Sequence, residues 1–161
     1  MTTAIKDRLF LVADADKLNK AFEDSKAKSA LLVVAEAKTG KIVASTSKPS
    51  FDPNIKNIQS YLDPLLSVAF EPGSTMKTYT YMAAMEAGTY KGNEKFMSGK
   101  YTTSDGTKIY DWLKSGFGEI TYDEGFSYSS NVGIINLIDK YMNKTILADY
   151  FEKLGFGKKT G

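Results

Sequence analysis

The segment AFEPGSTMKTYTYMAAMEAG, residues 69–88, limits the possible folds of this chain more than any other. A Pro-Gly pair sets a tight turn, and apolar residues then recur at helical spacing up to the final glycine. Proline and glycine at the start of a helix and glycine after its end are typical boundary signals. We therefore predict a helix over residues 74–87, with Ser74 in its first turn and Lys77 three residues later on the same face.

Ser74 and Lys77 form an S-x-x-K motif that is suited to nucleophilic chemistry. Unpaired backbone N–H groups in the first turn of a helix favour negative charge on a serine oxygen or on a nearby oxyanion. An exposed lysine, with a pKa of about 10.4, is a poor base at neutral pH. Burial against Met76, Tyr79 or Phe126 would lower the pKa of Lys77 into a useful range. The alternative is a helix-capping serine beside a solvated lysine.

A second polar motif, Ser129-Ser130-Asn131, lies between two predicted helices. The first helix follows the capping-box pattern TYDE at 121–124, and the second covers residues 132–142. Ser129 and Asn131 could both face a cleft, where one would relay a proton and the other would donate an amide hydrogen bond. The alternative is again a helix cap, because serine and asparagine are common N-cap residues.

The composition excludes several kinds of catalytic site. The 161 residues include no cysteine and no histidine, which excludes thiol nucleophiles, Ser-His-Asp triads and zinc sites built on those residues. A serine nucleophile must therefore take its base from Lys, Tyr, Asp or Glu. The net charge of +2, without a basic cluster, does not indicate a nucleic-acid partner. The sequence also has neither a run of 18 apolar residues nor the apolar core of a signal peptide near its N-terminus.

Other elements are predicted along the rest of the chain. Residues 14–28 are predicted to form an amphipathic helix, with one face composed of Leu18, Ala21, Phe22 and Ser25. Two β-rich runs, 30–35 and 41–46, predict a hairpin in which Gly40 has a positive φ and Leu31–Val34 are buried on both faces. A loop is expected at 47–61, short strands at 100–110, and a last helix at 146–154, capped by Thr145.

The two motifs and the segments around them resemble one family. S-x-x-K, S-D-N and K-T-G are the motif set of penicillin-binding proteins and class A β-lactamases. Here STMK is followed, about fifty residues later, by SSN. The segments AKTGKIVASTSKPSFDPN, FEPGSTMKTYTYMAAMEAG, DW at 111–112, GFSYSSNVGII and LGFGKKTG have the order of a class B penicillin-binding protein transpeptidase domain. The likeness runs from about residue 29 to the last residue and is closest to division-type enzymes of Gram-positive bacteria.

This resemblance implies an α+β fold of the penicillin-binding protein and serine β-lactamase type, with an antiparallel sheet and a helical subdomain. Residues 1–28 would be a lead-in helix, 29–47 a hairpin of the central sheet, and 62–161 a mostly helical part that carries both motifs. The K-T-G triplets at 38–40 and 159–161 fall in a turn and in a loop after a helix. Neither precedes the long strand that carries the third motif of the family. We therefore expect an incomplete, N-terminal part of the domain, without that strand.

The resemblance also implies roles for four residues and a set of partners. Ser74 would attack the D-Ala-D-Ala bond of a peptidoglycan stem peptide with Lys77 as its base. Ser129 would pass a proton to the leaving group, while Asn131 would hold Lys77 and the substrate amide. Ser74, Ser129 and Asn131 would thus also bind substrate, and β-lactams would acylate Ser74. No metal or organic cofactor is implied.

The expected partners are the stem peptide, β-lactams, the remaining part of the domain (which could be a second chain) and divisome proteins. The parent would lie on the extracytoplasmic face of the membrane, anchored by an N-terminal helix. Three alternatives stay open. They are a β-lactam sensor or non-catalytic penicillin-binding domain, a serine β-lactamase, and a structural half whose hairpin lacks its neighbouring strands.

Overall fold

The computed structural model describes residues 16–159. The chain divides into two compact units, Met1–Phe70 and Glu71–Gly161, and each is described by itself. The first two residues of the predicted helix at 14–28 and the last two of the second K-T-G triplet lie outside the described residues. The mostly helical part was expected from residue 62, whereas the second unit begins at Glu71.

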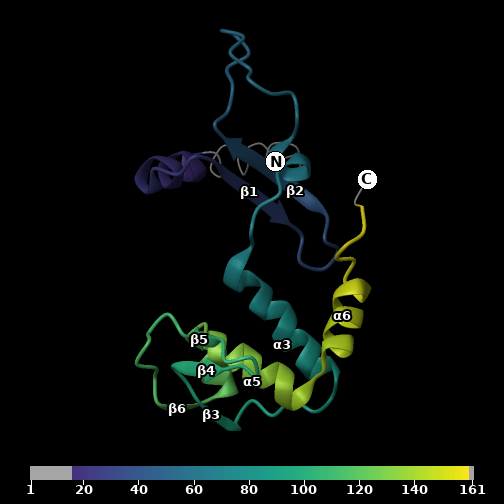
Figure 1. Ribbon diagram of the computed structural model, residues 1–161. Helices are drawn as coiled ribbons and strands as arrows, with labels where there is room; N and C mark the ends of the chain where they lie inside the picture. Colours follow the sequence, from purple (N-terminus) through teal and green to yellow (C-terminus); the bar gives the residue numbers. More distant parts are fainter. Residues whose placement is uncertain (1–15, 160–161) are drawn as a thin grey trace. The chain divides into compact units, whose positions relative to one another are not determined.

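The first unit contains a helix and a β-hairpin (Figure 1). Residues 16–25 are helical, and β1 (Ala30–Ala35) pairs antiparallel with β2 (Ile42–Lys48). The first K-T-G triplet lies in the hairpin turn, where Gly40 has a φ of 71°. A short helix, α2 (Pro64–Ser67), follows a long loop and is capped by the Asp63 side chain.

One expectation for the hairpin was wrong. Leu31–Val34 are not buried on both faces: Leu32 and Val34 are half-buried, while Leu31 and Val33 are 37% and 36% exposed. The reason is that, in the described residues, β1 and β2 form a sheet of two strands only. The helix at 16–25 buries Leu18 and half of Phe22, but leaves Ala21 and Ser25 exposed.

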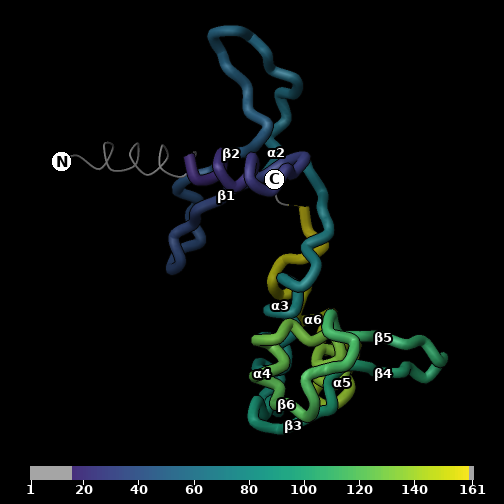
Figure 2. Tube along the Cα trace, turned by 90° about the vertical axis from the view of Figure 1, so that its left-hand side faces the viewer, coloured from purple at the N-terminus to yellow at the C-terminus, as the bar shows by residue number. Residues whose placement is uncertain are grey.

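The second unit holds the two predicted motifs and consists mainly of helices. Its elements in chain order are the 3₁₀ turn η1 (Gly73–Thr75), α3 (Met76–Glu86), β3 (Lys95–Met97), β4 (Lys100–Thr102), β5 (Lys108–Tyr110), β6 (Glu119–Thr121), α4 (Tyr122–Ser127), α5 (Asn131–Tyr141) and α6 (Lys144–Lys153). α3 packs against α5 and α6. β3 pairs with β6, and β4 with β5, both antiparallel. Figure 2 shows β4 and β5 extending from the helices as a two-stranded arm.

Phe96 on β3 joins α4 and α5 in the core of this unit. Its ring packs on two helical glycines, since a Cβ added at Gly125 or Gly133 would lie 2.9 Å from ring atoms of Phe96. The ring of Tyr122 lies 5.0 Å from that of Phe96, between centroids. Leu137 of α5 is fully buried in the same cluster. The absence of side chains at the two glycines thus lets one aromatic ring fix two helices.

Side-chain caps determine where these helices begin. The predicted capping box is present, because Thr121 Oγ1 accepts from Glu124 N and Glu124 Oε2 accepts from Thr121 N. The predicted cap of α6 was wrong: Asn143, rather than Thr145, accepts from the N–H of Ile146. Its amide oxygen reaches the third residue of the helix, so α6 begins two residues earlier than predicted. No helix within residues 16–159 combines the length and the apolar character that crossing a membrane requires.

Candidate active site

Lys77 lies in α3 as predicted, whereas Ser74 lies in the 3₁₀ turn η1 just before this helix rather than in its first turn. Gly73 has a φ of 59°, in the left-handed region that glycine tolerates, and this opens the turn η1 that leads into α3. Ser74 is exposed, and its hydroxyl makes no hydrogen bond within the part of the chain that the structure describes. The side chain at this position is therefore free to meet a ligand.

Lys77 is half-buried and contacts the second motif. Its Nζ donates to the carbonyl oxygen of Ser129 at 2.5 Å and to Ser129 Oγ at 3.1 Å. Burial lowers the pKa of Lys77 below its ordinary value of 10.5, and the negative charge of Asp111 opposes this effect in part. The direction agrees with the expectation for Lys77, and a lysine of this kind gives up its proton more easily than a solvated one.

Ser129 has a backbone conformation that glycine usually supplies. It follows the C-cap of α4 with a φ of 55°, its N–H donates to Phe126 O, and the next N–H, of Ser130, donates to Gly125 O. These two bonds define a Schellman motif, whose left-handed residue is most often glycine. An L-residue there costs roughly 1–2 kcal/mol. A serine in this place brings a hydroxyl to Lys77 at some cost in stability.

Two variants of Ser129 test whether its left-handed backbone costs stability. Both Ser129→Gly and Ser129→Ala lose the hydroxyl, but only glycine relieves the left-handed backbone. Part of the gain is offset by the greater freedom of glycine in the unfolded chain, which amounts to about 0.4–1 kcal/mol. We therefore expect the free energy of unfolding, measured by urea denaturation, to be up to about 1 kcal/mol higher for the glycine variant than for the alanine variant. A less stable glycine variant would contradict the assignment of strain to this residue.

The other two residues of the second motif have different partners. Asn131 Nδ2 donates to the carbonyl oxygen of Tyr110 at 2.9 Å, and the expected hydrogen bond between Asn131 and Lys77 is not found among residues 16–159, where Lys77 Nζ donates to Ser129. Ser130 is buried and caps α5 by accepting from Gly133 N at 2.8 Å. The capping alternative therefore holds for Ser130, while Ser129 faces Lys77.

The sequence did not reveal the role of Asp111. Its carboxylate is 2% exposed and accepts hydrogen bonds from Ser130 Oγ, from Val132 N and from Gly99 N, at 2.8–3.0 Å. Burial alone would raise the pKa of Asp111, but these hydrogen bonds outweigh it and hold the pKa below the ordinary value. The only sequence signal was the dipeptide DW at 111–112, which carries part of the family resemblance.

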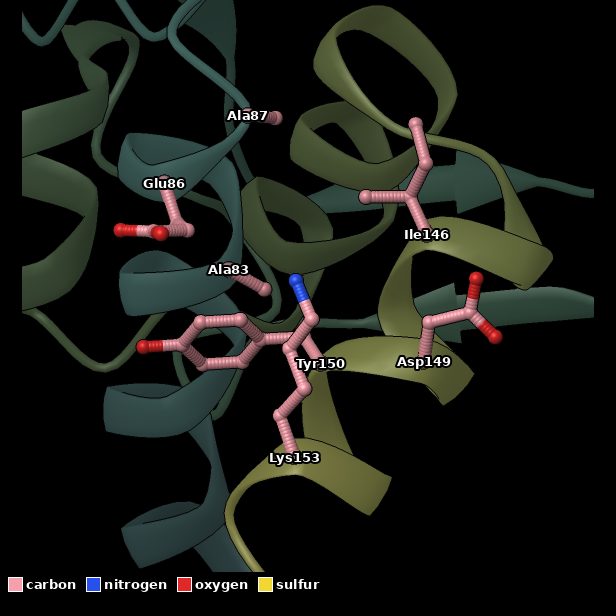
Figure 3. Close-up of a pocket in the computed structure, with 7 residues that line it drawn as sticks. All are labelled: Ala83, Glu86, Ala87, Ile146, Asp149, Tyr150 and Lys153. Carbon is pink, nitrogen blue, oxygen red and sulfur yellow. The ribbon is translucent and has the colours of Figure 1, made fainter.

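A separate hollow lies between α3 and α6 (Figure 3). Ala83 and Glu86 line it from α3, while Tyr150 and Lys153 line it from α6. None of the four predicted site residues belongs to it. Among residues 16–159, no group of three or more His, Cys, Asp or Glu side chains is placed to hold a metal ion.

The sequence is similar to those of known proteins. The profile of the penicillin binding protein transpeptidase domain matches residues 30–161, which is most of the chain. The chain belongs to this family. It is 30% identical over 149 residues to the peptidoglycan D,D-transpeptidase FtsI of Escherichia coli, covering 89% of this chain and 24% of that protein. It is 32% identical over 139 residues to the stage V sporulation protein D of Bacillus subtilis, covering 81% and 21%.

The transpeptidase relatives are much longer than this chain, which spans about a quarter of their length. Since they include proteins of both Escherichia coli and Bacillus subtilis, the narrower likeness to enzymes of Gram-positive bacteria stays a prediction. A solved structure described as a peptidoglycan glycosyltransferase from Burkholderia ambifaria is similar as well, with a TM-score of 0.78 and 26% identity, covering 92% of this chain and 43% of that one. The predicted α+β fold of the penicillin-binding protein type is thereby confirmed for the part of the domain present here.

Proposed function

We propose that this chain is part of a peptidoglycan D,D-transpeptidase in which Ser74 is the nucleophile and Lys77 its base. One observation carries the proposal: the ammonium of Lys77, one turn after Ser74, is held by both oxygen atoms of Ser129. This contact joins the two motifs across 52 residues of sequence. The exposed Ser74, in the turn η1 just before α3, supplies the third member of the site.

The reaction would run in two steps. Ser74 Oγ attacks the carbonyl carbon between two D-alanines and loses its proton to Lys77, and the oxyanion accepts from the backbone N–H of Ser74. The C–N bond then breaks, and the leaving amine of D-alanine takes a proton delivered through Ser129. An amine of a second stem peptide next attacks the acyl-enzyme ester, forms a new amide and releases Ser74 with its proton restored. Asn131, at the start of α5, is proposed to bind the amide of the substrate.

The substrate and partners follow from the same proposal. Stem peptides that end in D-Ala-D-Ala would be substrates, and β-lactams would acylate Ser74 in their place. The site would then face the cell wall, on the extracytoplasmic side of a membrane to which the longer protein is anchored. Contacts with the remaining part of the domain and with divisome proteins belong to the proposal as well.

The test is the intact mass of the protein after incubation with benzylpenicillin, measured on this chain and on the longer protein from which it derives. We expect a stable penicilloyl adduct on the longer protein that maps to Ser74, and none on its Ser74→Ala variant. An adduct retained in the variant would contradict the assignment of the nucleophile. Rapid release of the adduct by hydrolysis would instead indicate a β-lactamase, and acylation without cross-linking of stem peptides would indicate a sensor.

A further inference from the structure

Three consecutive residues, 110–112, hold the turn that carries Ser129. Each of them forms a hydrogen bond to a residue between 128 and 132. These bonds run from Asn131 Nδ2 to Tyr110 O at 2.9 Å, from Ser130 Oγ and Val132 N to Asp111 Oδ1 at 2.9 and 3.0 Å, and from Trp112 Nε1 to Tyr128 O at 2.9 Å. Ser129 lies within this run of residues, and its own hydroxyl accepts from Lys77.

Asp111 is the buried anchor of this segment. Its second carboxylate oxygen accepts from Gly99 N at 2.8 Å, and its own N–H donates to Gly99 O at 3.1 Å. Both oxygen atoms therefore have partners, which is the condition for burying a charged group without a large loss of stability. An asparagine amide at this position could not accept from Ser130, Val132 and Gly99 at once. Its oxygen can accept hydrogen bonds, but its NH₂ group can only donate them.

We propose that Asp111 is a positioning residue for the Lys77–Ser129 pair. Its carboxylate fixes Ser130 and the N–H of Val132 in the first turn of α5, and these fix the left-handed turn at Ser129. The hydroxyl and the carbonyl of Ser129 are thereby both directed at the ammonium of Lys77. The inference rests on the proposed function only in treating Lys77 as the base.

The charge of Asp111 has a second effect on the same pair. Burial lowers the pKa of Lys77, while the negative charge of Asp111 raises it and so limits the fall. Asp111 is the charged group whose effect on the pKa of Lys77 is resolved, rather than the carboxylates of α4 and α5, which are Asp123, Glu124 and Asp139. Asp111 thus affects both the geometry of the base and its affinity for a proton.

The test uses nuclear magnetic resonance of the full 161-residue chain labelled with ¹³C and ¹⁵N in lysine. Two properties of Lys77 are measured: the pH midpoint of its ε-carbon shift and the exchange rate of its ammonium protons with water. In Asp111→Asn, we expect the midpoint to move to lower pH and the exchange to become several-fold faster. In Ser130→Ala, which keeps the carboxylate but removes one of its donors, we expect faster exchange and a midpoint close to that of the wild type.

Asp149→Asn is the matched control, because Asp149 is exposed on α6 and its side chain makes no hydrogen bond in residues 16–159. It should change neither property. Unchanged ammonium exchange in both Asp111→Asn and Ser130→Ala would overturn the proposal, and if Asp111→Asn does not fold, Ser130→Ala decides alone. These measurements need no acylation, so they stay informative even if benzylpenicillin forms no adduct and the proposed function fails.

Discussion

Replacing Lys77 with arginine is expected to slow acylation of Ser74 by benzylpenicillin about 10²–10⁴-fold, the usual contribution of a positioned base. Arginine keeps the positive charge and can still donate to Ser129, but its guanidinium does not deprotonate in proteins. The variant thus removes the base and keeps the cation. The measurement is the rate at which the adduct appears, by intact mass, in the longer protein.

The pH dependence gives a second readout of the same variant. Lys77 acts as a base only when it is neutral, so the wild-type rate should rise with pH and level off above the pKa of Lys77. Because burial lowers this pKa, the inflection should lie below the ordinary lysine value of 10.5. Lys91→Arg is the matched control, since Lys91 is an exposed residue paired with Glu94 and arginine keeps that pair. A rate for Lys77→Arg within threefold of the wild type would exclude Lys77 as the base.

Phe96→Ala is expected to destabilise the second unit by about 3–5 kcal/mol, the usual cost of removing a buried phenylalanine. The large value is expected because Gly125 and Gly133 have no side chains with which to fill the space that the ring leaves. These glycines lie four residues before and four residues after Ser129. A cavity between them would loosen the turn that holds Ser129 against Lys77, so acylation should fall together with stability.

Urea denaturation followed by circular dichroism would measure the stability of this variant. Met97→Ala is the control on the same strand, because Met97 is 64% exposed and its loss should change the free energy of unfolding by less than about 0.5 kcal/mol. A loss below about 1 kcal/mol in Phe96→Ala would mean that helices α4 and α5 close over the cavity, and that Phe96 does not fix them.

Strong local signals in the sequence predicted most of the elements that carry the candidate site. The Pro-Gly pair and Gly88 predicted a helix over 74–87. The helix α3 begins two residues later, at Met76, and Gly88 follows its C-cap with a φ of 74°. The capping box at Thr121 placed α4, and the family resemblance implied that Lys77 and Ser129 would share a site. Each of these signals depends on residues close together in sequence or on a known motif.

What the sequence missed depends on contacts between distant segments. Asp111 lies 19 residues before Ser130, and nothing in its neighbourhood marks it as buried. The strands β3 and β6 are three residues each, too short to show alternation, and they form because they pair with one another. Asn131 was expected at Lys77 but is held by Tyr110, a residue of a strand whose approach to α5 the sequence does not indicate.

The hydrogen bond between Trp112 and Tyr128 has a practical consequence. Trp112 is the single tryptophan of the chain, it is 69% exposed, and its indole N–H is bound to the carbonyl of the residue just before Ser129. Phe117 lies beside it, with ring centroids 5.5 Å apart, and stacks in turn on Tyr128 at 4.5 Å. The protein therefore contains its own fluorophore at the candidate site. Its emission reports on the surroundings of Ser129 without any attached dye.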